Sequence, residues 1–423
     1  MLPRPRQLDV EHVGAFSRVR LEAYDRLVVC RLASLIALVG ASLAVAVGCG
    51  GASSSPQQAD RHGGTPAHSP AAGFDPALAS RLQKTLDRVR EQQEIPGAAA
   101  AVVSPGEGVW TGTSGEADTR THRPVTDHTL FAAGSITKTF VAALMLKLVE
   151  RDLLDLDEHL SRWVPEFPNS RLITLRQLLN HTSGTENFTD RTAFGEAQAS
   201  NPNAVWSPER TLRYAQHPDS EPGKDWDYSN TNYILAGLVI KRATRSTVAH
   251  ELHRRLLRRP EFGRILLQGD ERPRGSVAVG YQDLDGDSDL ERTPNNGYVP
   301  SMPEATAAWT AGGMLASAED LARAGDGIFR GSLLTDASRH EMSRFIRTRT
   351  REPPEYGLGL ARVDLGGEQV WAHNGDIFGF HADLAYMPKR HVTIAALNNY
   401  QQQALGQEAL IDALISDVSE HQP

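Results

Sequence analysis

The chain has 423 residues, enough for one large domain or two of modest size. Its formal net charge is −8 and it shows no basic stripe with interleaved aromatic residues, which argues against a nucleic-acid-binding protein. Its two cysteines, Cys30 and Cys49, both precede the predicted folded region, which therefore has no disulfide and no thiol chemistry. The histidines follow no metal-ligand spacing, so we expect no metal and no cofactor.

Residues 1–49 have the pattern of an export signal. The apolar run from Leu32 to Val47 is short for a membrane-spanning helix but suits the core of a signal peptide, and arginines precede it. It ends at Ala46-Val-Gly-Cys49, which resembles the lipobox of bacterial lipoproteins, whose cysteine becomes the lipidated first residue. We therefore expect an exported lipoprotein, held on the extracytoplasmic side of the cell membrane through Cys49; a plain secretory signal or an uncleaved anchor is the alternative. Residues 50–74, rich in Gly, Ser, Pro and Ala, predict a flexible tether.

Residues 75–423 predict one domain that begins with a helix and a hairpin. Asp75-Pro76 is a helix start signal, and a helical pattern follows from Ala77 to Gln92. Two short strand candidates, Ala98–Val103 and Val109–Ser114, then flank a turn rich in Pro and Gly.

The opposite end of this domain alternates in strand fashion and closes with an amphipathic helix. The predicted strands are Tyr356–Val363, Gln369–Ala372, Phe380–Met387 and His391–Leu397, and the helix is Ala404–Val418. The stretch from about residue 152 to 320 is rich in helices and loops. Because adjacent short strands joined by tight turns are antiparallel, we expect an α+β fold: one antiparallel sheet built from both termini, flanked by helices, with a mostly helical insertion. The cleft between sheet and insertion is the natural place for a site.

Ser135 and Lys138 are one helical turn apart in the segment Phe131-Ala-Ala-Gly-Ser-Ile-Thr-Lys-Thr-Phe140. Ser-x-x-Lys alone also describes a serine that caps a helix, followed by a lysine in solvent. Apolar residues from Phe140 to Val149, however, cover nearly all sides of the helix, which predicts a buried helix and a desolvated lysine. Such a lysine loses its proton more easily and can act as a base toward Ser135, whose own N–H can bind a developing oxyanion.

Two polar motifs follow downstream, Tyr228-Ser-Asn230 and His373-Asn-Gly375. Each has a structural explanation when it is taken alone. The tyrosine can simply open the next helix, with Asn230 or Thr231 as its cap, and a histidine on a strand is commonly structural. Together with the Ser-x-x-Lys pair, the motifs describe an acyl-transfer site.

Five motifs occur in a fixed order along the chain, and they carry a family resemblance. They are Ser135-Ile-Thr-Lys138, Leu178-Leu-Asn-His-Thr-Ser-Gly184, Pro222-Gly-Lys-Asp-Trp-Asp-Tyr-Ser-Asn-Thr-Asn-Tyr-Ile-Leu-Ala-Gly-Leu238, Gly312-Gly-Met-Leu-Ala-Ser-Ala-Glu-Asp-Leu321 and His373-Asn-Gly375. The chain resembles the serine β-lactamase-related superfamily of class C β-lactamases, D-Ala-D-Ala carboxypeptidases and esterases. The likeness spans roughly residues 76 to 418 and implies the β-lactamase/transpeptidase fold.

By position, the resemblance implies that Ser135 is the acylated nucleophile and Lys138 its proton-accepting neighbour. Tyr228 would be a phenol that passes a proton between nucleophile and leaving group. Because a phenol has an ordinary pKa near 10, it needs a nearby cation to act as a base at neutral pH, and Lys138 would supply one. Asn230 would hold the lysine or a substrate amide by hydrogen bonds.

His373-Asn-Gly375 stands where many of these relatives have Lys-Thr-Gly. Gly375 lets the strand backbone approach a ligand closely, and the N–H of Asp376 would be the second oxyanion donor beside that of Ser135. Asp376 replaces a small hydroxyl residue that is common in relatives that bind carboxylates. Its negative charge would repel a substrate carboxylate, which favours a neutral ester or amide.

Other features are less specific. His181 in His181-Thr-Ser-Gly184 is interpreted as support for a turn at the edge of the site. Asp283–Asp289 predicts a polar hairpin tip rather than a calcium loop, because Gly does not stand at the sixth position and Pro294 occupies the twelfth. Trp226 and Trp309 either line the cleft or belong to the core.

The sequence therefore predicts an extracytoplasmic serine hydrolase that acts through an acyl-enzyme on Ser135, on ester, amide or β-lactam carbonyls. Its expected partners are a small-molecule or peptide substrate and the membrane, through the lipid anchor. A D-Ala-D-Ala carboxypeptidase acting on cell-wall stem peptides is the alternative. A non-catalytic lipoprotein that binds penicillin or muropeptide is the rival from another class, although a pure binder has no need of Ser135, Lys138 and Tyr228 together. The oligomeric state stays open.

Overall fold

The computed structural model describes residues 73–258, 262–283, 290–294, 297–350, 353–401 and 409–421. All of them belong to the second of two units of the chain, which begins at Pro70. The predicted signal sequence, Cys49 and almost all of the predicted tether lie outside the described residues. Within the described part, no helix is long and apolar enough to cross a lipid bilayer.

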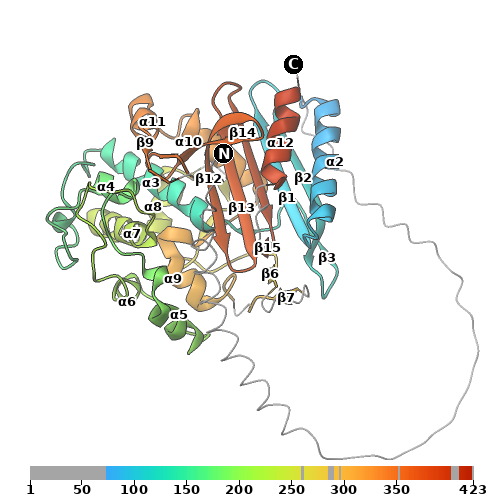
Figure 1. Cartoon of the computed structure of the whole chain (residues 1–423). Helices are drawn as coiled ribbons and strands as arrows, with labels where there is room; N and C mark the ends of the chain where they lie inside the picture. Colours follow the sequence, from blue (N-terminus) through green and yellow to red (C-terminus); the bar gives the residue numbers. More distant parts are fainter. Residues whose placement is uncertain are drawn as a thin grey trace, which may run out of the picture. The chain divides into compact units, whose positions relative to one another are not determined.

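An antiparallel sheet of nine strands forms the centre of this unit (Figure 1). The first long strand of the domain pairs with the last one, so that Ala98 lies opposite Asn398 and Val103 opposite Thr393. The predicted α+β fold, with one sheet built from both termini, is confirmed. From edge to edge the strands are β3 (Arg123–Pro124), β2 (Gly108–Asp118), β1 (Gly97–Ser104), β14 (Val392–Asn398), β13 (Phe380–Met387), β12 (Glu368–Ile377), β11 (Ala361–Leu365), β10 (Glu355–Tyr356) and β9 (Ile346–Arg347).

Two strands differ from the prediction in ways that matter for the site. The predicted strand Tyr356–Val363 is divided into β10 and β11 by a turn in which Gly359 has a φ of 66°. β12 continues five residues beyond the predicted end at Ala372, because its pairing with β13 runs on to Ile377 opposite Phe380. The polar residues of this extension break the apolar alternation on which the prediction rested, yet they remain in the sheet.

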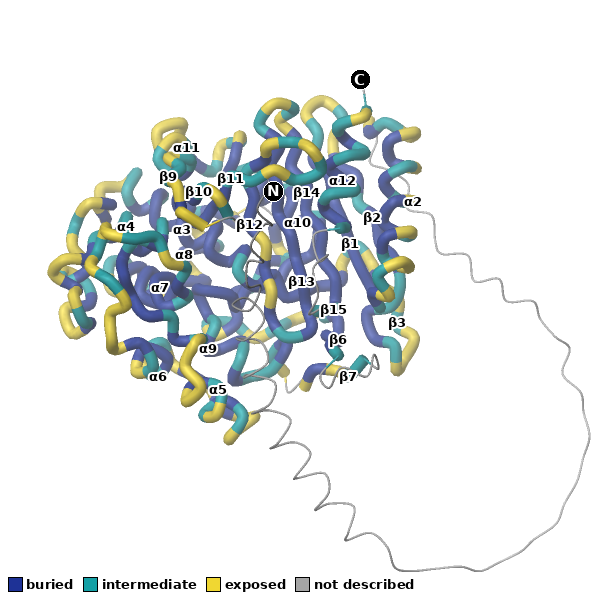
Figure 2. Tube along the Cα trace, viewed as in Figure 1, coloured by how far each residue is buried: buried dark blue, intermediate teal, exposed yellow. Residues whose placement is uncertain are grey.

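Helices cover both faces of the sheet (Figures 1 and 2). α2 (Pro76–Gln92) and α12 (Ala409–Glu420) pack together on one face, and α10 (Ala318–Phe329) contacts β1 and β14 on the other. α2 begins as predicted, because Asp75 accepts a hydrogen bond of 2.6 Å from the Leu78 N–H and Pro76 is the first helical residue. β13 and β14 are buried along their whole length, including the polar residues His381, Asp383 and Thr393.

The remaining elements lie mostly between β3 and β9 in the chain and include two small sheets of three strands. The small sheets are β15 (Tyr400–Gln401), β6 (Tyr281–Gln282) and β7 (Glu291–Arg292), and β4 (Phe131–Ala132), β8 (Met314–Ala316) and β5 (Leu266–Leu267). The helices are η1 (Gly134–Ile136), α3 (Thr137–Val149), η2 (Leu160–Arg162), α4 (Leu175–Leu179), η3 (Phe188–Asp190), α5 (Thr192–Ala199), α6 (Pro208–Leu212), α7 (Asn230–Thr244), α8 (Val248–Arg255), α9 (Met302–Gly312) and α11 (Asp336–Met342).

The segment Asp283–Asp289, predicted to be a hairpin tip, lies largely outside the described residues. Its two flanks, β6 and β7, pair in antiparallel fashion, with Tyr281 opposite Arg292. This pairing is the arrangement that a hairpin requires.

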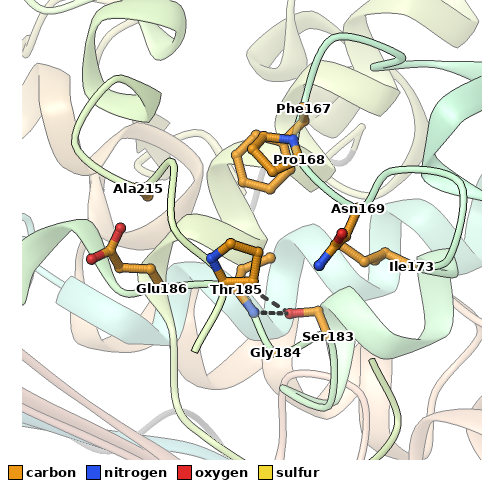
Figure 3. Close-up of a pocket in the computed structure, with 10 residues that line it drawn as sticks. Phe167, Pro168, Asn169, Ile173, Ser183, Gly184, Thr185, Glu186 and Ala215 are labelled. Carbon is orange, nitrogen blue, oxygen red and sulfur yellow. Dashed lines mark hydrogen bonds between the residues drawn. The ribbon is translucent and has the colours of Figure 1, made fainter. Parts of the chain in front are cut away.

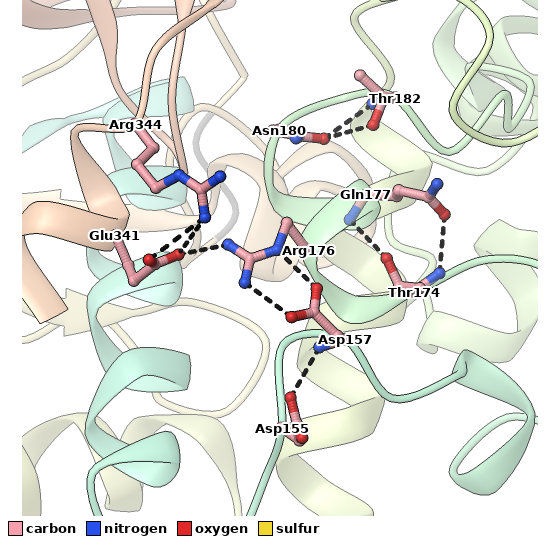
Figure 4. A network of polar contacts seen from close by, with 9 residues as sticks. All are labelled: Asp155, Asp157, Thr174, Arg176, Gln177, Asn180, Thr182, Glu341 and Arg344. Carbon is pink, nitrogen blue, oxygen red and sulfur yellow. Dashed lines mark hydrogen bonds and ion pairs between the residues drawn. The ribbon is translucent and has the colours of Figure 1, made fainter.

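A network of ion pairs holds α4 against α11 (Figure 4). The Arg176 guanidinium donates to Asp157 at 2.7 Å and to Glu341 at 2.5 Å, and these carboxylates raise the pKa of Arg176 above its usual range. Thr174 and Gln177 cap the start of α4 by bonding to each other's backbone N–H groups. The network therefore fixes the short helix that leads directly into the His181 turn.

Candidate active site

Ser135 lies at the entrance of the buried helix α3, in the short 3₁₀ turn η1 rather than in the α-helix itself. As predicted, α3 is almost wholly buried; among its residues only Lys147 and Val149 are partly exposed. The Ser135 side chain is partly exposed, while Lys138, three residues later, reaches back to its hydroxyl. The entrance turn thus presents the serine to solvent and keeps the lysine beneath it.

The Lys138 amine is buried and has three hydrogen-bond partners among the described residues. Its Nζ lies 2.9 Å from Ser135 Oγ, 2.7 Å from Asn230 Oδ1 and 2.7 Å from the Ala311 carbonyl oxygen, and the residue is fully buried. Burial holds the pKa of Lys138 well below its usual range. A neutral amine has two N–H groups and one lone pair. Because the amide and carbonyl oxygens can only accept, they take the two N–H groups and leave the lone pair to the Ser135 hydroxyl.

The Tyr228 ring lies next to the same amine and to the Ser135 hydroxyl. Lys138 Nζ is 4.9 Å from the centre of the Tyr228 ring, and Tyr228 also interacts with the Ser135 hydroxyl. Burial raises the pKa of the Tyr228 phenol and the charge of Asp376 adds to the effect, whereas the bond with Ser135 acts in the opposite direction. The phenol is therefore protonated in this state. Helix α7 has Ser229 as its N-cap and no side-chain cap hydrogen bond, so the alternative in which Asn230 or Thr231 caps the helix is wrong.

Asn230 is held in one orientation by its own neighbours. Its backbone N–H donates to Asn187 Oδ1 at 3.0 Å and its Nδ2 donates to Thr189 Oγ1 at 3.3 Å. The side-chain oxygen of Asn230, Oδ1, then accepts the hydrogen bond from Lys138. In the resting site Asn230 therefore orients the lysine.

Two glycines bring the backbone of η1 against the end of β12. A Cβ placed on Gly375 would lie 2.0 Å from the Ala133 carbonyl oxygen and 2.9 Å from the Ser135 nitrogen. A Cβ on Gly134, whose φ is 49°, would lie 2.9 Å from the Asp376 nitrogen. No residue larger than glycine fits at either position. The backbone nitrogens of Ser135 and Asp376 thus lie on the two sides of one tight junction, as a pair of oxyanion donors requires.

His373 is buried beside Tyr228, but both of its ring nitrogens are already engaged. Nδ1 lies 2.6 Å from the Asn374 carbonyl oxygen, so it carries the proton and donates it. Nε2 then accepts a hydrogen bond of 2.9 Å from the Tyr356 hydroxyl. Burial lowers the pKa of His373 to about 3, so the ring is neutral. In this arrangement His373 fixes Tyr356 and has no free nitrogen for a substrate.

The Asp376 side chain is turned toward the opposite face of the sheet from Ser135. It faces its cross-strand partner His381, whose Nδ1 lies 2.8 Å from Asp376 Oδ1, and the other ring nitrogen lies 3.0 Å from Asp383 Oδ2. Although burial alone would lower it, the two carboxylates hold the pKa of His381 well above its usual range. One imidazolium between two carboxylates leaves a net negative charge, and the Asp376 side chain remains 36% exposed.

Several residues of the site were not predicted to belong to it. The Ala311 carbonyl is a backbone group and leaves no signal in the sequence. Tyr233 and Tyr356 pack around His181, with ring centres 5.4 and 5.0 Å from the imidazole. Tyrosines are equally common in a protein core, so only the position of these two side chains in the structure shows that they belong to the candidate site.

The two tryptophans whose place the sequence left open are now located. Trp226 is partly buried and lies against His181 and Tyr356 beside the site. Trp309 is buried, with Nε1 donating to Asp270 Oδ1 at 3.1 Å. Its φ of 33° marks a strained turn within α9, two residues before the carbonyl that accepts from Lys138.

A hollow next to the His181-Thr-Ser-Gly184 turn is separate from this arrangement (Figure 3). It is lined by Phe167, Glu186 and neighbouring residues, and is too tight to admit a water molecule. On its wall, Ser183 and Thr185 both donate to Asn232 Oδ1, at 2.5 and 2.8 Å. The hollow is a packing defect behind the turn rather than a binding site.

Comparison with known proteins places this arrangement in a family. The beta-lactamase family model matches residues 82–415, most of the chain. Esterase EstB of Burkholderia gladioli is 34% identical over 188 residues, which are 41% of this chain and 47% of the esterase. A D-aminopeptidase of Brucella anthropi is 26% identical over 333 residues, which are 76% of this chain and 59% of that enzyme. The matches thus span only about half to three fifths of these two relatives.

Solved structures extend the likeness in three dimensions. A D-stereospecific amidohydrolase from a Streptomyces species superposes with a TM-score of 0.65 and 29% identity, over 76% of this chain and 94% of that one. A D-amino acid amidase from Ochrobactrum anthropi SV3, complexed with L-phenylalanine amide, has a TM-score of 0.70 over 81% of this chain and 99% of that one. At 24% identity this second likeness shows the fold alone. The chain therefore belongs to the beta-lactamase family, and it is an enzyme of the serine hydrolase class.

Proposed function

We propose that this enzyme hydrolyses ester and amide bonds through an acyl-enzyme on Ser135. The observation that carries the proposal is the 2.9 Å contact between Ser135 Oγ and the amine of Lys138, which is fully buried and has a lowered pKa. A nucleophile within hydrogen-bond reach of a neutral base is the arrangement that covalent catalysis needs. The backbone N–H groups of Ser135 and Asp376 supply the matching oxyanion site.

In the acylation step, Ser135 Oγ attacks the substrate carbonyl carbon while its proton passes to the Lys138 amine. The carbonyl oxygen becomes an oxyanion held by the N–H groups of Ser135 and Asp376. When the intermediate collapses, the bond to the leaving group breaks and the Tyr228 phenol gives it a proton. Lys138 then returns a proton to Tyr228, so no net proton is gained or lost.

In the deacylation step, a water molecule attacks the ester carbonyl of acyl-Ser135. The same base relay takes the proton of the water, and the bond between the acyl carbon and Ser135 Oγ breaks. The product acid leaves, and the serine hydroxyl recovers its proton. The three side chains and two backbone donors are thereby returned to their starting state.

The substrate class follows from the relatives. The sequence placed the Asp376 carboxylate near a substrate carboxylate, but it pairs with His381 on the face of the sheet opposite Ser135, so it does not decide between charged and neutral substrates. Relatives named as an esterase, a D-aminopeptidase and a D-stereospecific amidohydrolase support esters and amides of D-amino acids. A D-Ala-D-Ala carboxypeptidase is the second candidate, favoured by similarity to penicillin-binding protein 4* of Bacillus subtilis, at 22% identity over 345 residues.

Replacing Ser135 by Ala should abolish turnover without unfolding the protein. We expect kcat for a p-nitrophenyl ester to fall by about 10³-fold or more, because no other group can form the acyl-enzyme. Intact-mass spectrometry after incubation with a fluorophosphonate, penicillin, D-phenylalanine amide and its L-isomer would test the nucleophile and rank the substrates. The exposed Ser200 provides a matched control, and Ser200→Ala should behave as wild type. A folded Ser135→Ala protein that still turned over would refute the assignment, and a wild-type protein that bound penicillin without turning over any ester would favour the non-catalytic binder.

The rate of acylation should fall as the pH falls through the lowered pKa of Lys138, because only the neutral amine can accept the Ser135 proton. His373, whose pKa is lowered to about 3, stays neutral between about pH 5 and pH 9 and does not contribute to this fall in the acylation rate. The measurement is the rate of fluorophosphonate labelling against pH. Lys138→Arg, which stays protonated, should not label at any of these pH values, whereas Lys147→Arg on the same helix should match wild type. Normal labelling of Lys138→Arg would show that the lysine is not the base.

Gly375→Ala should inactivate the enzyme although it adds one methyl group. Because its Cβ would lie 2.0 Å from the Ala133 carbonyl oxygen, β12 must move away from η1 and the Asp376 N–H moves with it. We expect kcat to fall by about 10²-fold or more. The melting temperature of the variant distinguishes a lost oxyanion donor from a lost fold. Full activity in Gly375→Ala would place the second donor elsewhere.

We also propose that the enzyme is exported and attached to the membrane through a lipid on Cys49. The lipobox-like Ala46-Val-Gly-Cys49 and the Gly- and Ser-rich residues 50–74 support this placement. In a bacterial host, Cys49→Ala should shift the protein from the membrane fraction to the soluble fraction, because the mature chain then has no lipidated residue. Cys30→Ala, on the N-terminal side of the apolar run, is the matched control and should leave the distribution unchanged. Membrane attachment of Cys49→Ala would contradict the anchor.

A further inference from the structure

His181 is buried at the centre of the aromatic side chains beneath the site, and the mechanism above does not use it. The residue is fully buried, and four rings surround the imidazole, those of Trp226, Tyr228, Tyr233 and Tyr356. The closest of these four rings is that of Tyr228, whose centre lies 4.4 Å from the centre of the imidazole. Tyr228 is also the only one of the four to which the proposed mechanism gives a proton-transfer role. We propose that His181 is a positioning residue for the Tyr228 phenol, an inference that rests on the proposed function.

His181 bonds to the backbone on both sides of Tyr228. Its carbonyl oxygen accepts a hydrogen bond of 3.0 Å from the Asp227 N–H, and its Nδ1 accepts one of 3.2 Å from the Ser229 N–H. One residue therefore fixes the two peptide groups that flank Tyr228. Because Tyr228 precedes helix α7 and is not part of it, the helix does not hold its backbone at this point.

The ring of His181 supports the phenol from below. The His181 and Tyr228 rings are tilted by 33° with 4.4 Å between their centres, whereas the Tyr356 ring meets the imidazole edge-on at 61°. Lys138 Nζ lies on the Tyr228 ring at 4.9 Å from its centre. The phenol ring is therefore packed by the imidazole and the buried amine, and its hydroxyl is directed to Ser135.

The chemistry of the position explains why a histidine suits it. The backbone at His181 has a φ of 61°, in the left-handed region, where the chain makes the sharp turn that brings its carbonyl and side chain to the same loop. Burial holds the pKa of His181 well below its usual range, so the ring is neutral and Nδ1 is free to accept. The Nε2 atom is buried and has no hydrogen-bond partner among the described residues, so the contacts of the ring are those with the Tyr228 loop, Asn232 and the surrounding aromatic rings.

A double-mutant cycle in the full chain tests the proposal. His181→Asn retains an acceptor at the place of Nδ1 and tolerates the left-handed backbone, but removes the ring. Tyr228→Phe removes only the hydroxyl. We expect His181→Asn to lower kcat for a p-nitrophenyl ester by about 10- to 100-fold with KM changed by less than about 3-fold, because the substrate still binds while the phenol is misplaced. Since His181 acts through Tyr228, the double variant should be no slower than Tyr228→Phe, within about 2-fold.

His391→Asn is the matched control. His391 also has a left-handed backbone, with a φ of 59°, and its Nδ1 lies 2.9 Å from the Tyr386 hydroxyl, but it is in the turn between β13 and β14. It should leave kcat unchanged. If the melting temperature shows that His181→Asn does not fold, the cycle is run with His181→Phe, which keeps a ring and removes the acceptor for the Ser229 N–H.

Each outcome of the cycle decides the matter. Wild-type activity in the His181 variants, or losses that multiply in the double variant, would overturn the positioning role while the proposed function stands. If Tyr228→Phe itself kept full activity, the proton-transfer role of Tyr228 would fail, and the role of His181 with it. A rise in KM with unchanged kcat would assign His181 to substrate binding and would also overturn the proposal.

Discussion

The removal of the Lys138 amine from water is the constraint on which the site depends. A charged ammonium at this depth is costly, so the amine is most stable when it is neutral and when polar groups replace its water. Three groups from distant parts of the chain meet that need: the Ser135 hydroxyl, the Asn230 amide and the Ala311 carbonyl. The apolar helix α3, which has no catalytic side chain beyond its first turn, creates this environment simply by being buried.

The second constraint is the close approach of two backbones. β12 comes from the C-terminal part of the chain and η1 from the N-terminal part, and they touch because the sheet is built from both ends. Beyond Ala372, β12 has no pairing with β11, so its free edge is available to η1. Gly134 and Gly375 allow the contact, and together they place one backbone N–H from each end of the chain beside the candidate nucleophile.

Neutral aromatic side chains and a row of charged side chains lie on opposite faces of the sheet near these two contacts. The imidazoles of His181 and His373 are buried, uncharged and packed among tyrosines on the side of the nucleophile. On the other face of the sheet, His381 is charged and lies between the carboxylates of Asp376 and Asp383. The candidate reacting groups therefore lie in neutral surroundings, and the charged row faces away from them.

Much of the candidate site could be predicted from the sequence, because residues that could carry out this chemistry must have particular functional groups at particular spacings. Ser135 and Lys138 were predicted from one helical turn of spacing and from the apolar residues after them. Gly375 was predicted to let a ligand approach the strand, whereas in the structure it lets the backbone of η1 approach. The helix start at Asp75 and the strand Phe380–Met387 were also predicted, because a local cap determines the first and the alternation of residues between turns indicates the second.

The sequence by itself thus determined the fold class, the family and the chemical identity of the candidate nucleophile and base. Only the tertiary structure decided which partners these groups have. In the structure, Lys138 donates to the Ala311 carbonyl oxygen and the Asp376 carboxylate pairs with His381. Both ring nitrogens of His373 have hydrogen-bond partners, and His181 packs against the Tyr228 phenol ring. The physical reason is that a partner is defined by distance in space. Backbone carbonyls are the same at every position of a sequence, and the spacing of residues along the chain does not show which of them meet.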